Sequence, residues 1–93
     1  MHKSHQLVDS LKKGDERTIA SIYNDNRNGF LLFASRYEIS KEDIIDIYQD
    51  AIIVLCENAK KGKIDALKSS IQTYLFAIGK FMIFKKLKNK KEF

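Results

Sequence analysis

The chain has no proline and only four glycines in its 93 residues, which constrains the fold more than any other sequence feature. β-Sandwiches and β-barrels need many tight turns, and such turns are rich in proline and glycine. Apolar residues recur here at helical steps of three and four, and no useful length alternates as a strand does. We therefore predict an all-α fold, a small orthogonal bundle of four to five helices that forms one domain.

Two helices are predicted in the first half of the chain. Residues 5–13 form a short helix that stops at Gly14, and Asp15 can cap the next helix by accepting from its free N–H groups. The segment over residues 24–29 contains three asparagines and a glycine, and we expect it to bend or break this second helix.

Two more helices are predicted in the second half. Ser40 and Asp43 have the spacing of a capping box, so a helix should run from there to about Lys60 and end before Gly62. Residues 63–69 form a loop. A second capping pair, Ser69 with Gln72, predicts a last helix over about residues 70–88.

The middle helix has two contrasting sides. Its core stripe is formed by Ile44, Ile47, Tyr48, Ala51, Ile52 and Leu55. The other stripe, which we call the acidic stripe, is formed by Glu42, Asp46, Gln49, Asp50, Ile53 and Glu57. Like charges four residues apart disfavour a helix slightly, so a stripe with four acids and no base has two interpretations. It is a solvated face, or it is a docking face for a basic partner.

The last helix is apolar on nearly every side. Ile71, Leu75, Ile78 and Met82 are expected to face the core, with Tyr74 and Phe81 on a flank and Phe76, Ile83, Phe84 and Leu87 on the far side. Such a helix is buried on several sides or meets a partner. Aromatic rings beside lysines suit single-stranded nucleic acid, because bases stack on rings and ammonium groups neutralise phosphates. The alternatives are that the rings are core and that the lysines form a solvated helix end.

Charge is uneven along the chain, and few residues are of the types used in catalysis or metal binding. Residues 68–93 hold seven lysines and one acid, whereas the remainder is nearly balanced, so a polyanionic partner is expected. Cys56 is the sole cysteine, so no internal disulfide can form. His2 and His5 stand at the terminus, and no nucleophile–base pair or metal-ligand set is evident. We therefore expect no enzyme activity, no metal and no cofactor.

The first residues do not read as a signal peptide. The longest apolar stretch, over residues 74–84, is interrupted by Lys80 and is too short to span a bilayer. We expect a cytoplasmic protein.

Three stretches, in their order, resemble region 2 of a bacterial RNA polymerase sigma factor of the extracytoplasmic-function type. Residues 11–16, followed by Ile19, Ile22 and Tyr23, are similar to the first helix of the family. The sequence Asp-Ile-Tyr-Gln-Asp over residues 46–50 resembles its Asp-apolar-apolar-Gln-Glu motif. Residues 67–76 resemble the approach to its promoter-reading helix, with Tyr74 where Trp is common. The resemblance covers about residues 7–91.

The resemblance implies a transcription initiation factor with two binding surfaces. Asp46, Gln49, Asp50 and Ile53 would dock on the clamp helices of the largest subunit of core RNA polymerase. The last helix and the loop before it would bind and melt the minus-ten promoter element through its non-template strand. The residues assigned to DNA are Lys61, Lys63, Lys68, Tyr74, Lys80, Phe81, Phe84, Lys85 and Lys88. An anti-sigma factor is a further candidate partner.

The sequence departs from the family at three points. Phe81 stands where the family usually has Asn, which helps to form its base pocket, and Lys85 stands where Asp is frequent. The second DNA-reading domain, a helix-turn-helix, is absent, so we interpret the 93 residues as one region 2 domain excised from a longer protein. Residues 1–6 and 92–93 are expected to be disordered.

Two rival functions remain open on the sequence. A helical DNA-binding regulatory module of another family would explain the lysines but not the acidic stripe. A peripheral membrane helix over residues 76–91 would require apolar residues on one face, whereas they are spread around the helix.

Overall fold

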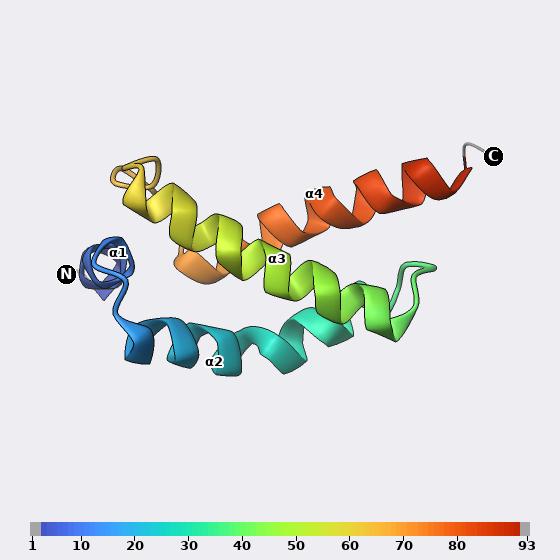
Figure 1. Ribbon diagram of the computed structural model, residues 1–93, viewed down its shortest axis with the longest axis horizontal. Helices are drawn as coiled ribbons and strands as arrows, with labels where there is room; N and C mark the ends of the chain where they lie inside the picture. Colours follow the sequence, from blue (N-terminus) through green and yellow to red (C-terminus); the bar gives the residue numbers. More distant parts are fainter. Residues whose placement is uncertain (1–2, 92–93) are drawn as a thin grey trace.

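The computed structural model describes residues 3–91, and within them the chain forms four helices and no strand. They are α1 (Lys3–Lys12), α2 (Glu16–Ala34), α3 (Lys41–Lys60) and α4 (Ile71–Lys91). The all-α prediction is confirmed. Figure 1 shows α2, α3 and α4 running back and forth along the long axis, with α1 seen nearly end-on across one end.

The helix ends follow the predicted chemistry at most positions. The Asp15 carboxylate accepts from the backbone N–H of Arg17, and Ser40 Oγ accepts from that of Asp43 at 3.1 Å. Gly14 and Gly62 have φ angles of +71° and +76°, a region that favours glycine and ends helices α1 and α3.

Two predictions about the helices differ from the structure. Residues 24–29 were expected to bend or break the second helix, and they do not break it: α2 continues through them, because packing on α3 and α4 outweighs poor helix propensity. The cap before α4 is Ser70, whose Oγ accepts from the Thr73 N–H at 3.0 Å, so Ser69 and Gln72 do not form the box. Helix α1 begins at Lys3, two residues before the predicted start. Residues 1–2 and 92–93 lie outside the described residues.

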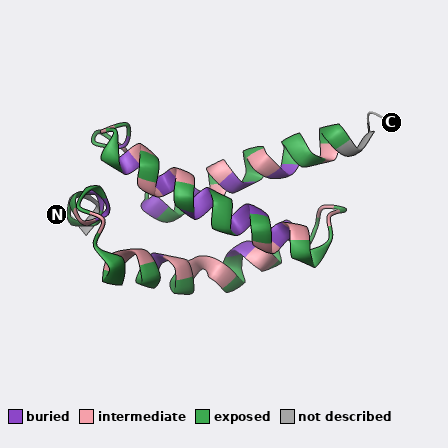
Figure 2. Cartoon of the chain, viewed as in Figure 1, coloured by how far each residue is buried: buried purple, intermediate pink, exposed green. Residues whose placement is uncertain are grey.

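The core lies where α3 meets the other helices (Figure 2). All six residues of the predicted core stripe of α3 are buried. The ring centroids of Phe30 and Tyr48 lie 5.2 Å apart, between α2 and α3. The ring of Phe76 in α4 meets that of Phe30 edge-on, with centroids 5.4 Å apart. The Tyr48 hydroxyl donates to the backbone carbonyl of Tyr23 at 2.7 Å, which satisfies the one polar atom of this ring.

The core stripe of α4 differs from the prediction. Ile71 and Leu75 are buried as expected, but the stripe continues through Gly79 and Ile83, at strict steps of four. Ile78 and Met82 are only partly buried beside it. The reason is Phe30, whose ring needs the space that a glycine leaves, so the helix turns Gly79 toward α2.

Candidate functional site

The acidic stripe lies on the open side of α3. Asp46, Gln49, Asp50 and Ile53 are all exposed, as are Glu42 and Glu57 at the ends of the stripe. Ile53 is 54% exposed, one of five large apolar side chains among residues 3–91 that lie on the surface. The stripe therefore combines four carboxylates with one exposed apolar side chain and carries no basic residue.

The exposed side of α4 forms a second surface, which we call the ring–lysine face. It consists of Ala77, Lys80, Phe81, Phe84, Lys85 and Lys88, all of them exposed. Phe81 is 67% exposed and Phe84 47% exposed, so neither ring is a core residue. This face points away from the bundle, because the buried residues of α4 occupy the opposite side of the helix.

The ring of Phe84 is held by two neighbours. Tyr37, in the connection between α2 and α3, meets it edge-on with ring centroids 5.6 Å apart. The ammonium of Lys80, one turn earlier on α4, lies 5.6 Å from the centroid of the same ring. The ring is thereby oriented while nearly half of its surface stays open to solvent.

The structure separates two other aromatic residues of α4 from this face. Phe76 is partly buried against Phe30 and Phe33, so it belongs to the core periphery. Tyr74 stands two turns before Phe81 on the same side, but it is half-buried, and its hydroxyl accepts from the Asn58 side chain at 2.9 Å. The hydrogen bond ties Tyr74 to the end of α3.

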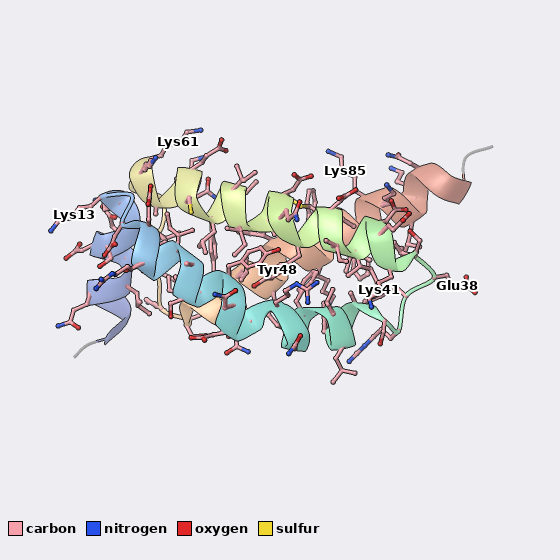
Figure 3. All side chains as sticks on the ribbon, turned by 60° about the horizontal axis from the view of Figure 1, so that its bottom comes forward. Lys13, Glu38, Lys41, Tyr48, Lys61 and Lys85 are labelled. Carbon is pink, nitrogen blue, oxygen red and sulfur yellow. The ribbon has the colours of Figure 1, made fainter. Side chains whose placement is uncertain are left out.

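The predicted DNA-binding lysines fall into two groups. Lys80, Lys85 and Lys88 belong to the ring–lysine face, whereas Lys61, Lys63 and Lys68 are exposed in the connection between α3 and α4. Figure 3 places Lys61 and Lys85 toward opposite ends of the molecule. A strand that contacts both groups must therefore follow at least the first ten residues of α4, from Ile71 to Lys80, which is about 15 Å.

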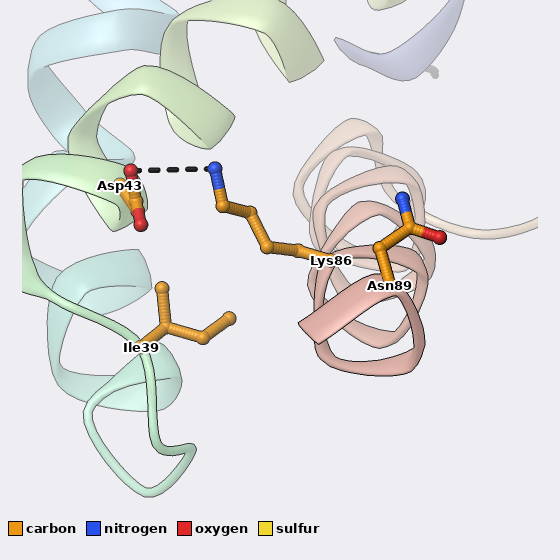
Figure 4. A pocket seen from close by; sticks show the side chains of 4 residues that line it. All are labelled: Ile39, Asp43, Lys86 and Asn89. Atoms are coloured by element: carbon orange, nitrogen blue, oxygen red, sulfur yellow. Dashed lines mark ion pairs between the residues drawn. The ribbon is translucent and has the colours of Figure 1, made fainter. Parts of the chain in front are cut away.

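An open groove between α3 and α4 brings the two charged surfaces together. Asp46 and Asp50 line one wall, Lys85 and Lys86 line the other, and the groove has a volume of about 430 Å³. At its end Lys86 Nζ lies 3.3 Å from a carboxylate oxygen of Asp43, beside Ile39 and Asn89 (Figure 4). Sequence reasoning missed this juxtaposition, because it depends on how two helices separated by a loop pack side by side.

The single cysteine is not arranged as a nucleophile. Cys56 is partly buried on α3, and burial raises the pKa of its thiol, so little reactive thiolate forms near neutral pH. Across residues 3–91, no group of three or more potential ligands is placed to hold a metal ion. Within the same range, no helix is long and apolar enough to cross a bilayer.

Comparison with known proteins gives no relative from which to transfer a role: no protein family, no curated protein and no solved structure matches this chain.

Proposed function

We propose that this domain acts in transcription initiation, as region 2 of a sigma factor does. In this proposal the acidic stripe of α3 docks on core RNA polymerase, and the ring–lysine face of α4 holds the non-template strand of the melted minus-ten element. The proposal places the protein in the cytoplasm. Support comes from the resemblance of residues 11–23, 46–50 and 67–76 to that family and from the exposure of both surfaces.

The acidic stripe supports the docking half of the proposal. Asp46 and Asp50 are one helical turn apart, a spacing that costs a helix a few tenths of a kcal/mol, and Ile53 exposes an apolar side chain beside them. A basic partner surface would neutralise the acids and cover Ile53. Nothing in the packing of residues 3–91 requires either feature, because the buried side of α3 is complete without them.

The ring–lysine face supports the DNA half. Exposed rings bind bases only when the bases are unstacked, so a face with Phe81 and Phe84 favours single strands over duplex. Lysines alone would favour duplex, which has the higher charge density. The combination is suited to capturing a melted strand.

The observation that carries the proposal is the pairing of these surfaces on neighbouring helices. An acidic surface with an apolar anchor lies on α3, and a basic surface with two exposed rings lies on α4, across one groove. This pair of surfaces suits a domain that contacts a basic protein surface and a nucleic acid at the same time. A DNA-binding module without a protein partner needs only the second.

Affinity capture of core RNA polymerase tests the docking half. Asp46→Lys and Asp50→Lys should each weaken capture, while Asp9→Lys, the matched charge reversal at an exposed position of α1, should leave it unchanged. Circular dichroism should show all three variants folded, since exposed substitutions usually change stability by less than about 0.5 kcal/mol. Undiminished capture by both α3 variants would contradict the docking assignment.

Strand binding tests the DNA half. With core polymerase present, single-stranded minus-ten sequence should bind more tightly than the matching duplex. The binding constant should fall with salt at a log–log slope of roughly −2 to −4, as expected for about three to five phosphate contacts. Strand binding without any polymerase capture would instead favour the rival DNA-binding module.

A further inference from the structure

The acidic stripe and the ring–lysine face lie side by side with opposite charges that are not paired with each other. Asp50 of α3 and Lys85 of α4 line the two walls of one groove. The ion pair that joins the two helices is Lys86 with Asp43, at the end of the groove. Asp50 and Lys85 form no ion pair with any residue of the described range. Their charges can therefore be neutralised by a second molecule.

Each wall of the groove also exposes an apolar side chain, and the two lie at the same level. Helices α3 and α4 are antiparallel (Figure 1). Ile53 follows Asp50 by three residues, and Phe81 precedes Lys85 by four, so both lie about one turn from the charged residues, toward the same end of the groove. More than half of each of these apolar side chains is exposed.

A two-fold axis that runs along the groove makes this surface complementary to itself. A half-turn about that axis exchanges the two walls and preserves the level of each residue along the groove. Asp50 of one copy then faces Lys85 of the second copy, and Ile53 faces Phe81. Each contact occurs twice, and the assembly closes at two chains. A two-fold axis across the groove would instead place acids against acids.

We propose that this surface of α3 and α4 binds a second copy of the chain, in a two-fold dimer that pairs the acidic stripe with the ring–lysine face. Charge complementarity selects this occupant, because the acids need a basic surface with apolar side chains, and the chain itself carries one at the matching level. The net charge of +5 opposes self-association, and exposed ion pairs weaken as salt rises. The dimer is therefore weak and sensitive to salt.

The dimer would cover both surfaces that the proposed function uses. A chain within it could neither dock on the polymerase nor hold a DNA strand, so self-association would keep the factor inactive at high concentration. This inhibitory role rests on the proposed function. Dimer formation itself does not, because it depends only on the charges and apolar side chains of the two walls.

Analytical ultracentrifugation of the whole 93-residue chain tests the inference. At about 50 mM salt, the weight-average mass should rise with protein concentration from the 10.8 kDa of one chain toward twice that value. At about 500 mM salt it should fall back toward the mass of one chain, because the charges are screened over a few ångströms. Circular dichroism should show the same helix content at both salt concentrations.

Charge reversals test the predicted contact directly. Asp50→Lys should weaken the dimer at least about tenfold, because lysines then face each other at both symmetry-related contacts. Lys85→Glu should do the same with carboxylates. An equimolar mixture of these two variants should dimerise within about threefold of the parent, since opposite charges again meet at both contacts. Asp9→Lys on α1 adds the same charge as Asp50→Lys and should weaken the dimer by less than about threefold.

Three results would overturn the inference. The mass of one chain at every concentration in low salt would show that the surface does not bind a second copy, and the proposed function would be unaffected. A dimer that either single reversal leaves intact, or that the mixture fails to restore, would show that Asp50 and Lys85 do not meet. A mass that rises beyond two chains would replace the closed dimer with an open assembly. Failure of polymerase capture beside an intact dimer would contradict the proposed function alone.

Discussion

Gly79 of α4 lies directly against the ring of Phe30 in α2. A Cβ atom added to Gly79 would collide with Cε1 and Cζ of the Phe30 ring, closer than any relaxed pair of carbon atoms. Phe30 itself is fully buried and contacts the rings of Tyr48 and Phe76, so it has little freedom to move aside. This contact sets the rotation of α4 and thereby decides which of its residues face solvent.

Gly79→Ala should destabilise the domain despite the higher helix propensity of alanine. Overpacking a filled core costs about 1–3 kcal/mol, and each kcal/mol lowers the melting temperature of a domain of this size by roughly 4–8 °C. Gly29→Ala is the matched control, because a Cβ there would lie 3.7 Å from Phe76, an ordinary contact. The control should be neutral or more stable by up to about 1 kcal/mol. Equal melting temperatures for the two variants would show that the contact is not tight.

Stability should decline in alkali through Tyr48. Burial, and secondarily the neighbouring Tyr23, raises the pKa of the Tyr48 hydroxyl from 10.0 to about 12. The folded chain thus keeps this proton between pH 10 and pH 12 while the unfolded chain loses it, so the free energy of unfolding falls across this window. The full loss is roughly 2–3 kcal/mol.

Tyr48→Phe isolates this contribution from the other groups that titrate in alkali. At pH 7 the variant should be less stable by about 0.5–1.5 kcal/mol, because it lacks the hydrogen bond to the Tyr23 carbonyl. Its stability should decline less steeply than that of the parent above pH 10 in denaturant titrations. Parallel pH profiles for the two chains would be incompatible with a raised pKa at Tyr48.

Removing charge from the acidic wall of the groove should strengthen DNA binding. Asp46 and Asp50 share the groove with Lys85 and Lys86, so they attract these lysines and repel phosphates. The double variant Asp46→Asn and Asp50→Asn should bind a single strand about two- to fivefold more tightly at low salt, with the gain shrinking as salt rises. Asp9→Asn on α1 removes charge far from the groove and should have a smaller effect. Unchanged or weaker binding by the double variant would show that the two aspartates do not oppose the binding of phosphates by the lysines across the groove.

Phe81→Asn should leave the fold nearly intact. The ring of Phe81 is 67% exposed, so its replacement removes little packing, and the two residues have similar helix propensities. The melting temperature should stay within a few degrees of the parent, as expected for a stability change below about 0.5 kcal/mol. A loss of several kcal/mol would instead place Phe81 in the core.

The sequence by itself determined the helices and the two sides of α3. Asp15, Ser40, Gly14 and Gly62 act locally, through caps and backbone conformation, so their roles follow from residue type and spacing alone. The core stripe of α3 could be read in the same way, because its apolar residues hold to one face through the whole helix.

The tertiary structure decided which side of α4 is buried. Large apolar residues surround this helix on most sides, so periodicity could not choose among them, and the prediction put Ile83 on the wrong side. The choice came from Phe30, a residue of another helix, whose ring requires the space at Gly79. With that rotation fixed, Phe81 and Phe84 turn outward, and Lys85 and Lys86 come to lie across the groove from Asp46 and Asp50. Packing between helices produces these contacts, and no pattern within either helix encodes them.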